Sequence, residues 1–430
     1  MALRHNFSWI FIGNVFYAAA QWGMLTVLAK IGTPEMVGKF ALGLAITAPV
    51  MMFTNMNLQY VQATDTGTQY QFGDYLALRL TATTLALLII LGIVGVTDYR
   101  ETTALVVLLV GVAKAFESIS DVFYGLLLQR ERMDRIAKSM ILRGSLALLA
   151  LGLVIYFTDS LVWGVVGLGL AWALVLFGFD LRSGALVLSR AAPHMLSGSR
   201  IRKARRAFLL LRPRWAIGTL RRLTLLALPL GLVMALANLN LNIPRYFIEQ
   251  YLGERELGIF AAMSYVTVAG LLMATAVGQA VMPRLAKYYA AHKRAEFQNL
   301  LLRLMIIGAV LGLVGVLASV VAGPEILTLL YGPQYAEYPG VFSLLMVAVA
   351  ILFVALFLGA AMTAARYFRI QAPLFVISVC TSAAICWWLV PTAGLEGAAV
   401  AVVIAALVQL FGSLAIVIRA LHTLSDKESI

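Results

Sequence analysis

The chain has 430 residues, of which 62% are apolar and only 12% are charged, and its mean hydropathy is +0.91. Soluble domains carry about 25% charged residues, so this composition excludes a soluble enzyme and indicates a membrane protein. The formal net charge of +13 raises the question of a nucleic-acid partner. We expect no such partner, because most basic residues lie in short segments between long apolar runs.

Twelve apolar runs follow one another along the chain, each near the roughly 20 residues that span a bilayer. Arg4 and His5 precede the first run as in a signal peptide, but apolar residues continue to Ala29, which favours a first membrane helix. The predicted spans lie at approximately 8–29, 37–58, 76–96, 102–127, 141–157, 161–179, 223–242, 258–282, 298–322, 340–362, 371–391 and 396–418.

The distribution of basic residues predicts the orientation of these spans. With the N-terminus in the cytoplasm, 27 of the 33 Lys and Arg residues fall in or beside cytoplasmic segments. Cytoplasmic loops are enriched in these residues, so both termini are expected in the cytoplasm. The densest basic segment, 182–222, has eleven Lys or Arg and no Asp or Glu.

The first six spans and the last six spans show an internal repeat. Since six is an even number, both halves enter the membrane with the same orientation, and the repeat is parallel. Three glycine-containing motifs recur in order at offsets of about 220–234 residues, a spacing that we read from the sequence. They are Gly38-Lys39-Phe40-Ala41 with Gly258-Ile259-Phe260-Ala261, Gly125 with Gly359 (each followed ten residues later by Arg-Ile), and Gly164-x-x-Gly167 with Gly394-x-x-Gly397.

We therefore predict an all-α polytopic membrane protein with two six-helix bundles, residues 1–181 and 223–418, and a cytoplasmic tail, 419–430. Segment 182–222 is the predicted linker. Three roles are open for its positive charge: it sets the topology, binds anionic lipid head groups, or docks a cytoplasmic enzyme. Duplicated membrane proteins of this kind are most often transporters with a site between their halves.

Chemistry that the sequence lacks narrows the function further. The two cysteines, Cys380 and Cys386, share one apolar run, so neither a disulfide framework nor a thiolate metal site is expected. All four histidines fall outside the runs. The sequence has no phosphate-binding loop, metalloprotease motif, dinucleotide loop or nucleophile elbow. We predict a protein that is not an enzyme and has no cofactor, and the sequence leaves coupling to a Na⁺ or H⁺ gradient open.

The fourth predicted span carries three charges, Lys114, Glu117 and Asp121. Their spacing places them on one helical face, and each charge within a span costs about 2.5–3.5 kcal/mol on insertion scales. This face is therefore expected to look into the protein interior or a hydrated cavity. Two interpretations remain open: a structural Lys114–Glu117 pair, or a face that contacts substrate or a coupling ion.

Other polar groups sit in or at the ends of the spans. Lys39 and Arg245 lie near the outer ends of spans two and seven, where they either extend to the interface or contact substrate. Polar residues also recur on one face of the first span and of its repeat partner, span seven. They are Asn14, Tyr17 and Gln21 in the first, and Asn238 and Asn242 in the second. Interhelical hydrogen bonds or a cavity between the halves explains them.

Several stretches together resemble the polysaccharide transport family, the O-antigen and capsule oligosaccharide flippases of the MOP superfamily. The resemblance covers nearly the whole chain and rests on structural Gly and Pro motifs. These are Leu228-Pro229-Leu230, Asn242-Ile243-Pro244-Arg245-Tyr246-Phe247, Leu252-Gly253, Glu256-Leu257-Gly258-Ile259-Phe260, Leu327-Thr328-Leu329-Leu330-Tyr331-Gly332-Pro333-Gln334-Tyr335, Glu35-Met36-Val37-Gly38-Lys39-Phe40-Ala41 and Ala48-Pro49.

The resemblance implies a flippase for undecaprenyl-diphosphate-linked oligosaccharide in a bacterial inner membrane, with two bundles in a V around a central cavity that opens alternately to each side. A diphosphate needs cationic contacts, for which Lys39, Lys114 and Arg245 are the candidates. Glu117 and Asp121 are the candidates for ion coupling. Asn14, Gln21 and Asn238 would face the sugar. Expected partners are the lipid-linked oligosaccharide, membrane lipids, and a polysaccharide polymerase or glycosyltransferases.

Three alternatives stay open. A drug or metabolite exporter of the same superfamily, coupled to Na⁺ or H⁺, would use acidic residues in the first bundle. Glu117 and Asp121 would suit that role. A membrane-embedded glycan polymerase or ligase would carry a large external loop, which is not seen in the sequence. A major-facilitator transporter would have a basic turn after span two, where 59–74 has none.

Overall fold

The computed structural model describes residues 2–65, 69–191, 211–365 and 367–428. These residues are nearly all helical, and no strand occurs among them. The chain forms two compact units, Met1–Gly32 with Lys39–Asn238, and Thr33–Gly38 with Leu239–Ile430. The predicted all-α class is therefore confirmed.

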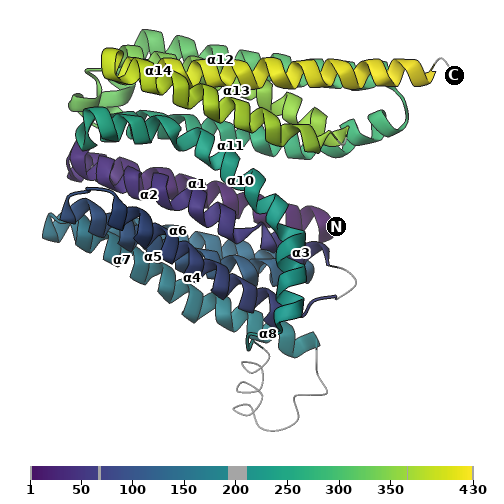
Figure 1. The fold of residues 1–430 in the computed structure, drawn as a ribbon, viewed down its shortest axis with the longest axis horizontal. Coiled ribbons are helices and arrows are strands. Elements are labelled where there is room, and N and C mark those ends of the chain that lie inside the picture. The colour runs from purple at the N-terminus through teal and green to yellow at the C-terminus, as the bar shows by residue number, and fades with distance from the viewer. Residues whose placement is uncertain (1, 66–68, 192–210, 366, 429–430) are drawn as a thin grey trace, which may run out of the picture. The chain divides into compact units, whose positions relative to one another are not determined.

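The first unit is a bundle of long apolar helices that lie alongside one another, drawn from purple to teal in Figure 1. Its core includes Tyr75, Phe123 and Leu127, all at most 1% exposed. The helices are α1 (Ala2–Ile31), α2 (Pro34–Asn55), α3 (Leu58–Thr64), α4 (Phe72–Val96), α5 (Glu101–Gln129), α6 (Met133–Thr158), α7 (Leu161–Val175), the π-helical turn η1 (Leu176–Asp180), α8 (Leu181–Ala191) and the first part of α10 (Ile217–Leu252).

The second unit is a bundle of the same kind, drawn in green and yellow in Figure 1. Its core gathers around Phe297, Phe357 and Leu358. Besides the end of α10, its elements are α11 (Glu254–Ala290), α12 (Arg294–Leu330), the 3-10 turn η3 (Pro333–Tyr335), α13 (Pro339–Ala364) and α14 (Phe368–Glu428). Gly394 interrupts α14 with a backbone φ of 59°, a left-handed value that glycine adopts at no steric cost.

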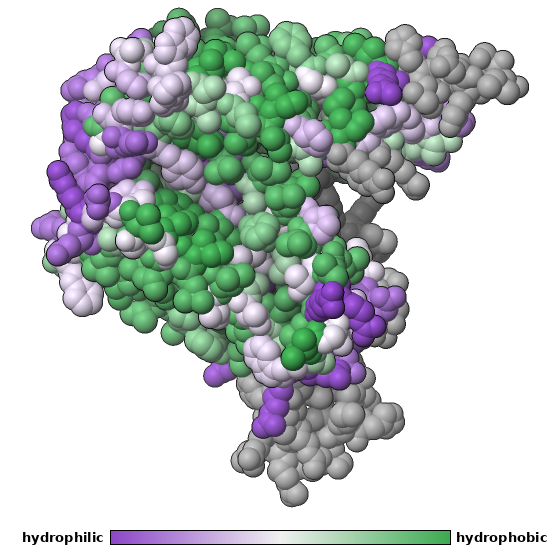
Figure 2. Space-filling model, in the orientation of Figure 1, coloured by the Kyte–Doolittle hydropathy of each residue, from purple (hydrophilic) through white to green (hydrophobic). Residues whose placement is uncertain are grey.

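Each of the twelve predicted spans coincides with a helical segment. Ten segments of the described chain are long and apolar enough to cross a membrane, and the last, 52 residues long, contains the break at Gly394. The eighth predicted span falls within α11. Hydrophobic side chains cover broad areas of the face seen in Figure 2, and hydrophilic side chains gather near helix ends. The chain is thus a multi-pass membrane protein.

Small residues bring α1 and α6 close together in the first unit. A methyl group placed on Gly13 would come within 2.8 Å of the Ala137 backbone, and one on Gly144 within 2.8 Å of Ala20 Cβ. Helices in lipid associate through such close backbone approaches, because no hydrophobic effect drives them together there.

The repeated glycines also lie at helix crossings. Within the second unit, a methyl group on Gly258 would overlap the carbonyl oxygen of Pro34, and one on Gly38 would overlap that of Glu254. The two glycines that the sequence aligns as repeat partners therefore permit one crossing between the start of α2 and the start of α11. Their recurrence reflects packing rather than chemistry.

The two ends of the predicted linker, 182–222, pack on the first unit. Ala185 and Val187 of α8 and Leu211 are buried in its core. The backbone N–H of Arg214 donates a hydrogen bond of 2.9 Å to the carbonyl oxygen of Gly73, at the start of α4. Residues 192–210 lie outside the described residues, so the role of their positive charge stays a prediction.

Gly258→Val should lower the midpoint of thermal unfolding of the purified protein, because its side chain would collide with backbone that cannot rotate away. Overpacking typically costs about 1–3 kcal/mol. Gly92→Val is the matched control, since nothing lies within 4 Å of a methyl group at Gly92. Equal midpoints for the two variants would contradict this account of the crossing.

Candidate functional site

The charged face predicted on the fourth span is present on α5. Lys114 Nζ lies 2.7 Å from Glu117 Oε2, and each of the two side chains is 18% exposed. The Lys114 ammonium also lies 5.2 Å from the ring centre of Trp172 on α7, within cation–π range. The face therefore turns toward neighbouring helices, as the spacing predicts, and the Lys114–Glu117 pair is formed.

Glu117 joins three helices. Its Oε1 accepts a hydrogen bond from the hydroxyl of Tyr17 on α1, and that hydroxyl accepts one of 2.8 Å from Gln21 Nε2. The same Oε1 lies 4.0 Å from Arg143 Nη1 on α6. A carboxylate that both an ammonium and a guanidinium approach is electrostatically stabilised as the anion. Glu117 is consequently a fixed element of the bundle as well as the counter-ion of Lys114.

Arg143 continues the network toward α7 and η1. Its Nη2 donates to Asp180 Oδ2 at 3.2 Å, and both side chains are at most 2% exposed. Ser139 donates to the other Asp180 oxygen at 2.5 Å, and the Arg143 guanidinium stacks 5.2 Å from the ring centre of Tyr124. Asp180 is the last residue of the π-helical turn Leu176–Asp180. Such turns are rare and occur often at functional sites.

Arg79 forms a second buried centre on α4. It is 1% exposed and donates through Nη1 to Asn55 Oδ1 at the end of α2 and to Ser118 Oγ, the latter at 3.3 Å. Ser118 in turn donates to Asn55 Oδ1 at 2.5 Å, and Thr83 Oγ1 lies 3.2 Å from Ser118 Oγ. Arg79 is thus held by neutral oxygens, and no carboxylate of the described residues pairs with it directly.

Asp121 differs from the other acids of this network. It makes no hydrogen bond or ion pair with any residue that the structure describes. It does interact electrostatically, most strongly with Arg79 and then with Glu117. Asp121 is therefore a half-buried carboxylate whose nearest influences are electrostatic rather than direct contacts.

The described part of the first unit therefore holds a charge-balanced set of six groups, which we call the charge network. Its cations are Arg79, Lys114 and Arg143, and its acids are Glu117, Asp121 and Asp180. Opposite charges buried together offset much of the cost of removing each from water. Lys114 is therefore one of three cations near these acids, rather than the sole cation beside Glu117 and Asp121.

Sequence reasoning missed Arg79, Arg143 and Asp180. Both arginines lie near the starts of predicted spans, 76–96 and 141–157. The helices begin earlier, at Phe72 and Met133, which places the two arginines about 10 Å and 15 Å along them. For Arg143, the mixed polar and apolar sequence from Met133 to Ile141 was a usable signal of the earlier helix start.

The remaining predicted residues of the first unit lie outside this network. Lys39 Nζ donates to Thr102 Oγ1 at 3.3 Å near the start of α5, about 18 Å along that helix from Lys114. Asn14 is exposed one turn before Tyr17 on α1, and Asn238 is half-buried at the end of this unit. Their assignment to substrate stays a prediction.

Arg245 belongs to the second unit and is 9% exposed. Its Nη1 donates to Asn242 Oδ1 at 3.0 Å, and its guanidinium lies 5.5 Å from the ring centre of Tyr265 on α11. It lies within α10, seven residues before the end of that helix at Leu252, so its place at the outer end of the predicted span stays a prediction. These contacts hold Arg245 in place by neutral groups.

Known proteins resemble this chain over nearly its full length. A capsular polysaccharide biosynthesis protein, CapF of Staphylococcus aureus, is 27% identical over 405 residues, which cover 94% of this chain and 96% of the relative. No family model matches the chain.

Solved structures show the same fold. An inward-facing multidrug resistance MATE transporter of the MOP superfamily matches with a TM-score of 0.64 at 14% identity, covering 98% of this chain and 95% of that one. A MOP superfamily transporter from Pyrococcus furiosus, described as having a binding pocket of reverse polarity, matches with a TM-score of 0.60 at 16% identity, covering 99% and 95%. The predicted likeness to MOP transporters is therefore confirmed at the level of the fold.

Arg143→Met should destabilise the protein by roughly 3–5 kcal/mol, because it leaves Asp180 buried without its cation. Thermal unfolding of the purified protein measures this, with Lys138→Ala, an exposed residue of the same helix, as the control. The double variant Arg143→Met with Asp180→Leu should recover part of the loss. A double variant less stable than the single one would show that the pair is not the source of the effect.

Proposed function

We propose that this chain is a flippase, which moves undecaprenyl-diphosphate-linked oligosaccharide from the cytoplasmic to the outer leaflet for the synthesis of a surface polysaccharide such as capsule, O-antigen or exopolysaccharide. It would act by alternating access in a bacterial inner membrane, with both termini in the cytoplasm. The MOP fold supports the transporter class. The name of the relative, a capsular polysaccharide biosynthesis protein, supports the substrate class.

The observation that carries the proposal is that the Lys114 ammonium is paired within the protein and still partly exposed. Its ammonium is held by Glu117 and Trp172, yet its side chain keeps 18% exposure. A diphosphate can therefore approach the open side and compete with Glu117 for the ammonium. Glu117 would not be left isolated, since Tyr17 and Arg143 also contact it. An anionic head group thus finds a cation that can change partners at modest cost.

The other predicted residues have supporting roles in this proposal. Lys39 and Arg245 would contact the head group or nearby phosphate oxygens, as conventional cationic ligands. Asn14, Gln21 and Asn238 would offer amide groups to the sugar hydroxyls. A polysaccharide polymerase or glycosyltransferases would act on the same lipid-linked substrate before or after it crosses the membrane.

Lys114→Ala should abolish export of surface polysaccharide while the protein stays in the membrane, because the head group loses its exchangeable cation. Complementation of a strain that lacks the gene, with surface polysaccharide measured by immunoblot, tests this. Lys30→Ala, an exposed lysine near the end of α1, is the matched control. Normal export by the Lys114→Ala variant would refute this assignment of the head-group site.

Asp121 supports coupling of transport to Na⁺ or H⁺, since its carboxylate has no direct partner among the described residues. Asp121→Asn should abolish transport driven by an imposed ion gradient in proteoliposomes while substrate still binds. Glu101→Gln, at the exposed start of the same helix, is the control. Gradient-driven transport by Asp121→Asn at the wild-type rate would remove Asp121 from the coupling step.

A second candidate function, an ion-coupled exporter of drugs or metabolites, is favoured by the same carboxylate and by the multidrug transporter among the structural neighbours. The two candidates differ in substrate. Cells that express the protein would gain resistance to cationic drugs if it is an exporter. They would regain surface polysaccharide, without such resistance, if it is a flippase.

A further inference from the structure

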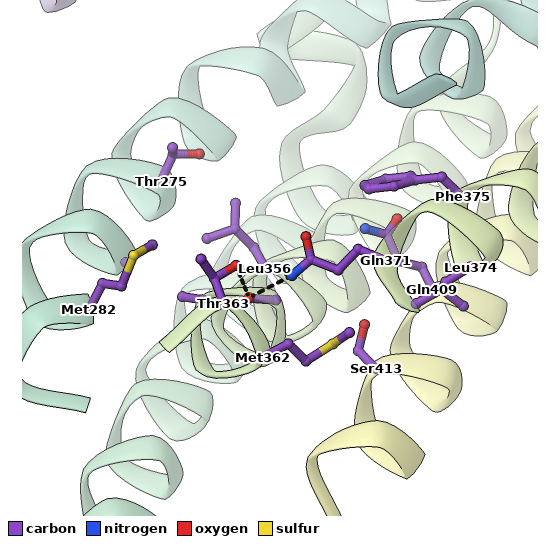
Figure 3. A pocket seen from close by; sticks show the side chains of 13 residues that line it. Thr275, Met282, Leu356, Met362, Thr363, Gln371, Leu374, Phe375, Gln409 and Ser413 are labelled. Carbon is purple, nitrogen blue, oxygen red and sulfur yellow. Dashed lines mark hydrogen bonds between the residues drawn. The ribbon is translucent and has the colours of Figure 1, made fainter. Parts of the chain in front are cut away.

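A separate pocket lies wholly within the second unit, between α11, α13 and α14 (Figure 3). Its volume is about 230 Å³. Pockets for drug-sized ligands measure roughly 300–1,000 Å³, so this one has room for a single ring-sized molecule. In Figure 3, Thr275 and Met282 approach from α11, Thr363 and Gln371 lie between, and Ser413 comes from α14.

Among the residues that the structure describes, the lining combines hydroxyl and amide groups with apolar side chains and includes no charged residue. Ions are poor ligands for such a lining. An ion that moved from water into this pocket would lose its hydration and find no opposite charge to offset that cost. The polar residues are Thr275, Thr363, Gln371, Gln409 and Ser413.

Gln371 is fixed in an orientation that leaves its acceptor oxygen available. Its Nε2 donates to Thr363 Oγ1 at 3.0 Å and to the carbonyl oxygen of Gly359 at 3.4 Å. Thr363 Oγ1 itself donates to the same carbonyl at 2.9 Å. Both amide hydrogens are thus used within the protein, while no described residue donates to Gln371 Oε1. The pocket therefore presents a fixed acceptor.

Two further polar groups of the pocket have no partner among the described residues. Ser413 is 3% exposed, yet its hydroxyl makes no hydrogen bond, not even the bond to a preceding carbonyl that Thr275 makes to Leu271 at 2.7 Å. The Gln409 amide makes none either. Buried polar groups are normally hydrogen-bonded, so unpartnered ones that line a cavity indicate a polar ligand.

The rest of the wall is apolar. Phe375 offers an aromatic face, and Leu356 and Met282 add aliphatic surface. A wall with fixed hydrogen-bonding groups on one part and an aromatic ring on another fits a molecule with a polar rim and apolar C–H faces. Sugars have this character, whereas lipid chains lack the polar rim.

We propose that this pocket binds one uncharged sugar ring through Gln371, Gln409 and Ser413. Its role in selecting the glycan rests on the proposed flippase function, whereas sugar binding itself does not. The pocket would add recognition of a neutral sugar to the recognition of an anionic head group assigned to Lys114.

N-acetylglucosamine is a suitable probe, since it has hydroxyls and an amide and carries no charge. With about fifteen non-hydrogen atoms it should bind with a dissociation constant on the order of 1 mM. Saturation-transfer NMR on the full-length protein, in a detergent without a sugar head group, measures the binding. Gln371→Leu and Ser413→Ala should each weaken it roughly tenfold, the usual effect of losing one or two hydrogen bonds.

Gln298→Leu, on α12 and outside the pocket, is the matched control and should bind as the wild type does. Glucuronate, which is charged, and cyclohexanol, a six-membered ring with a single hydroxyl, should bind more weakly than N-acetylglucosamine. The proposal is overturned if N-acetylglucosamine does not bind, if the pocket variants bind it as the wild type does, or if cyclohexanol binds equally well.

The outcomes separate this proposal from the proposed function. Pocket-dependent sugar binding without transport of lipid-linked oligosaccharide would leave the sugar site standing and refute the flippase. Transport of lipid-linked oligosaccharide without sugar binding in the pocket would support the flippase and refute the sugar site.

Discussion

The first unit depends on one constraint, that charges within a membrane-spanning bundle must find their counter-charges inside it. Arg143 meets that constraint for three helices, since it lies between Glu117 and Asp180. The close approach of α1 and α6 through Gly13 and Gly144 also brings α1 alongside this arrangement, where the Tyr17 hydroxyl bonds Glu117. Removing one member would leave another buried without its partner, so the network ties the packing of the bundle to its electrostatics.

Within this balanced network, two groups retain freedom to react to their surroundings. Lys114 is partly exposed and shares its carboxylate partner with Arg143, and Asp121 has no direct partner among the described residues. In the proposed function, Arg143 and Asp180 hold the bundle together, while Lys114 and Asp121 interact with substrate or ion. Both interpretations of the α5 face can then hold together: the Lys114–Glu117 pair is formed, and contact of the face with substrate or a coupling ion stays a prediction.

Hydropathy and spacing were sufficient to predict the helices and the charged face of α5, because both depend on local patterns along the sequence. The partners of that face could not be predicted, since they come from α1, α4, α6 and η1 and their pairing depends on tertiary packing. Arg79 and Arg143 were placed too close to helix ends because helices extend beyond their apolar runs. No pattern in the sequence pointed to the pocket around Gln371, since uncharged polar residues are common in membrane helices.

The proposed function is movement of lipid-linked oligosaccharide across a bilayer. Purified protein in liposomes that contain undecaprenyl-diphosphate-linked oligosaccharide tests it most directly, with an added glycosidase that cleaves only outward-facing glycan. If the protein flips this lipid, protein-containing liposomes lose nearly all of their glycan to the glycosidase. Protein-free liposomes lose about half, because only the outward-facing glycan is reached. A protected fraction of about half in both, with ion gradients of either direction imposed, would contradict it.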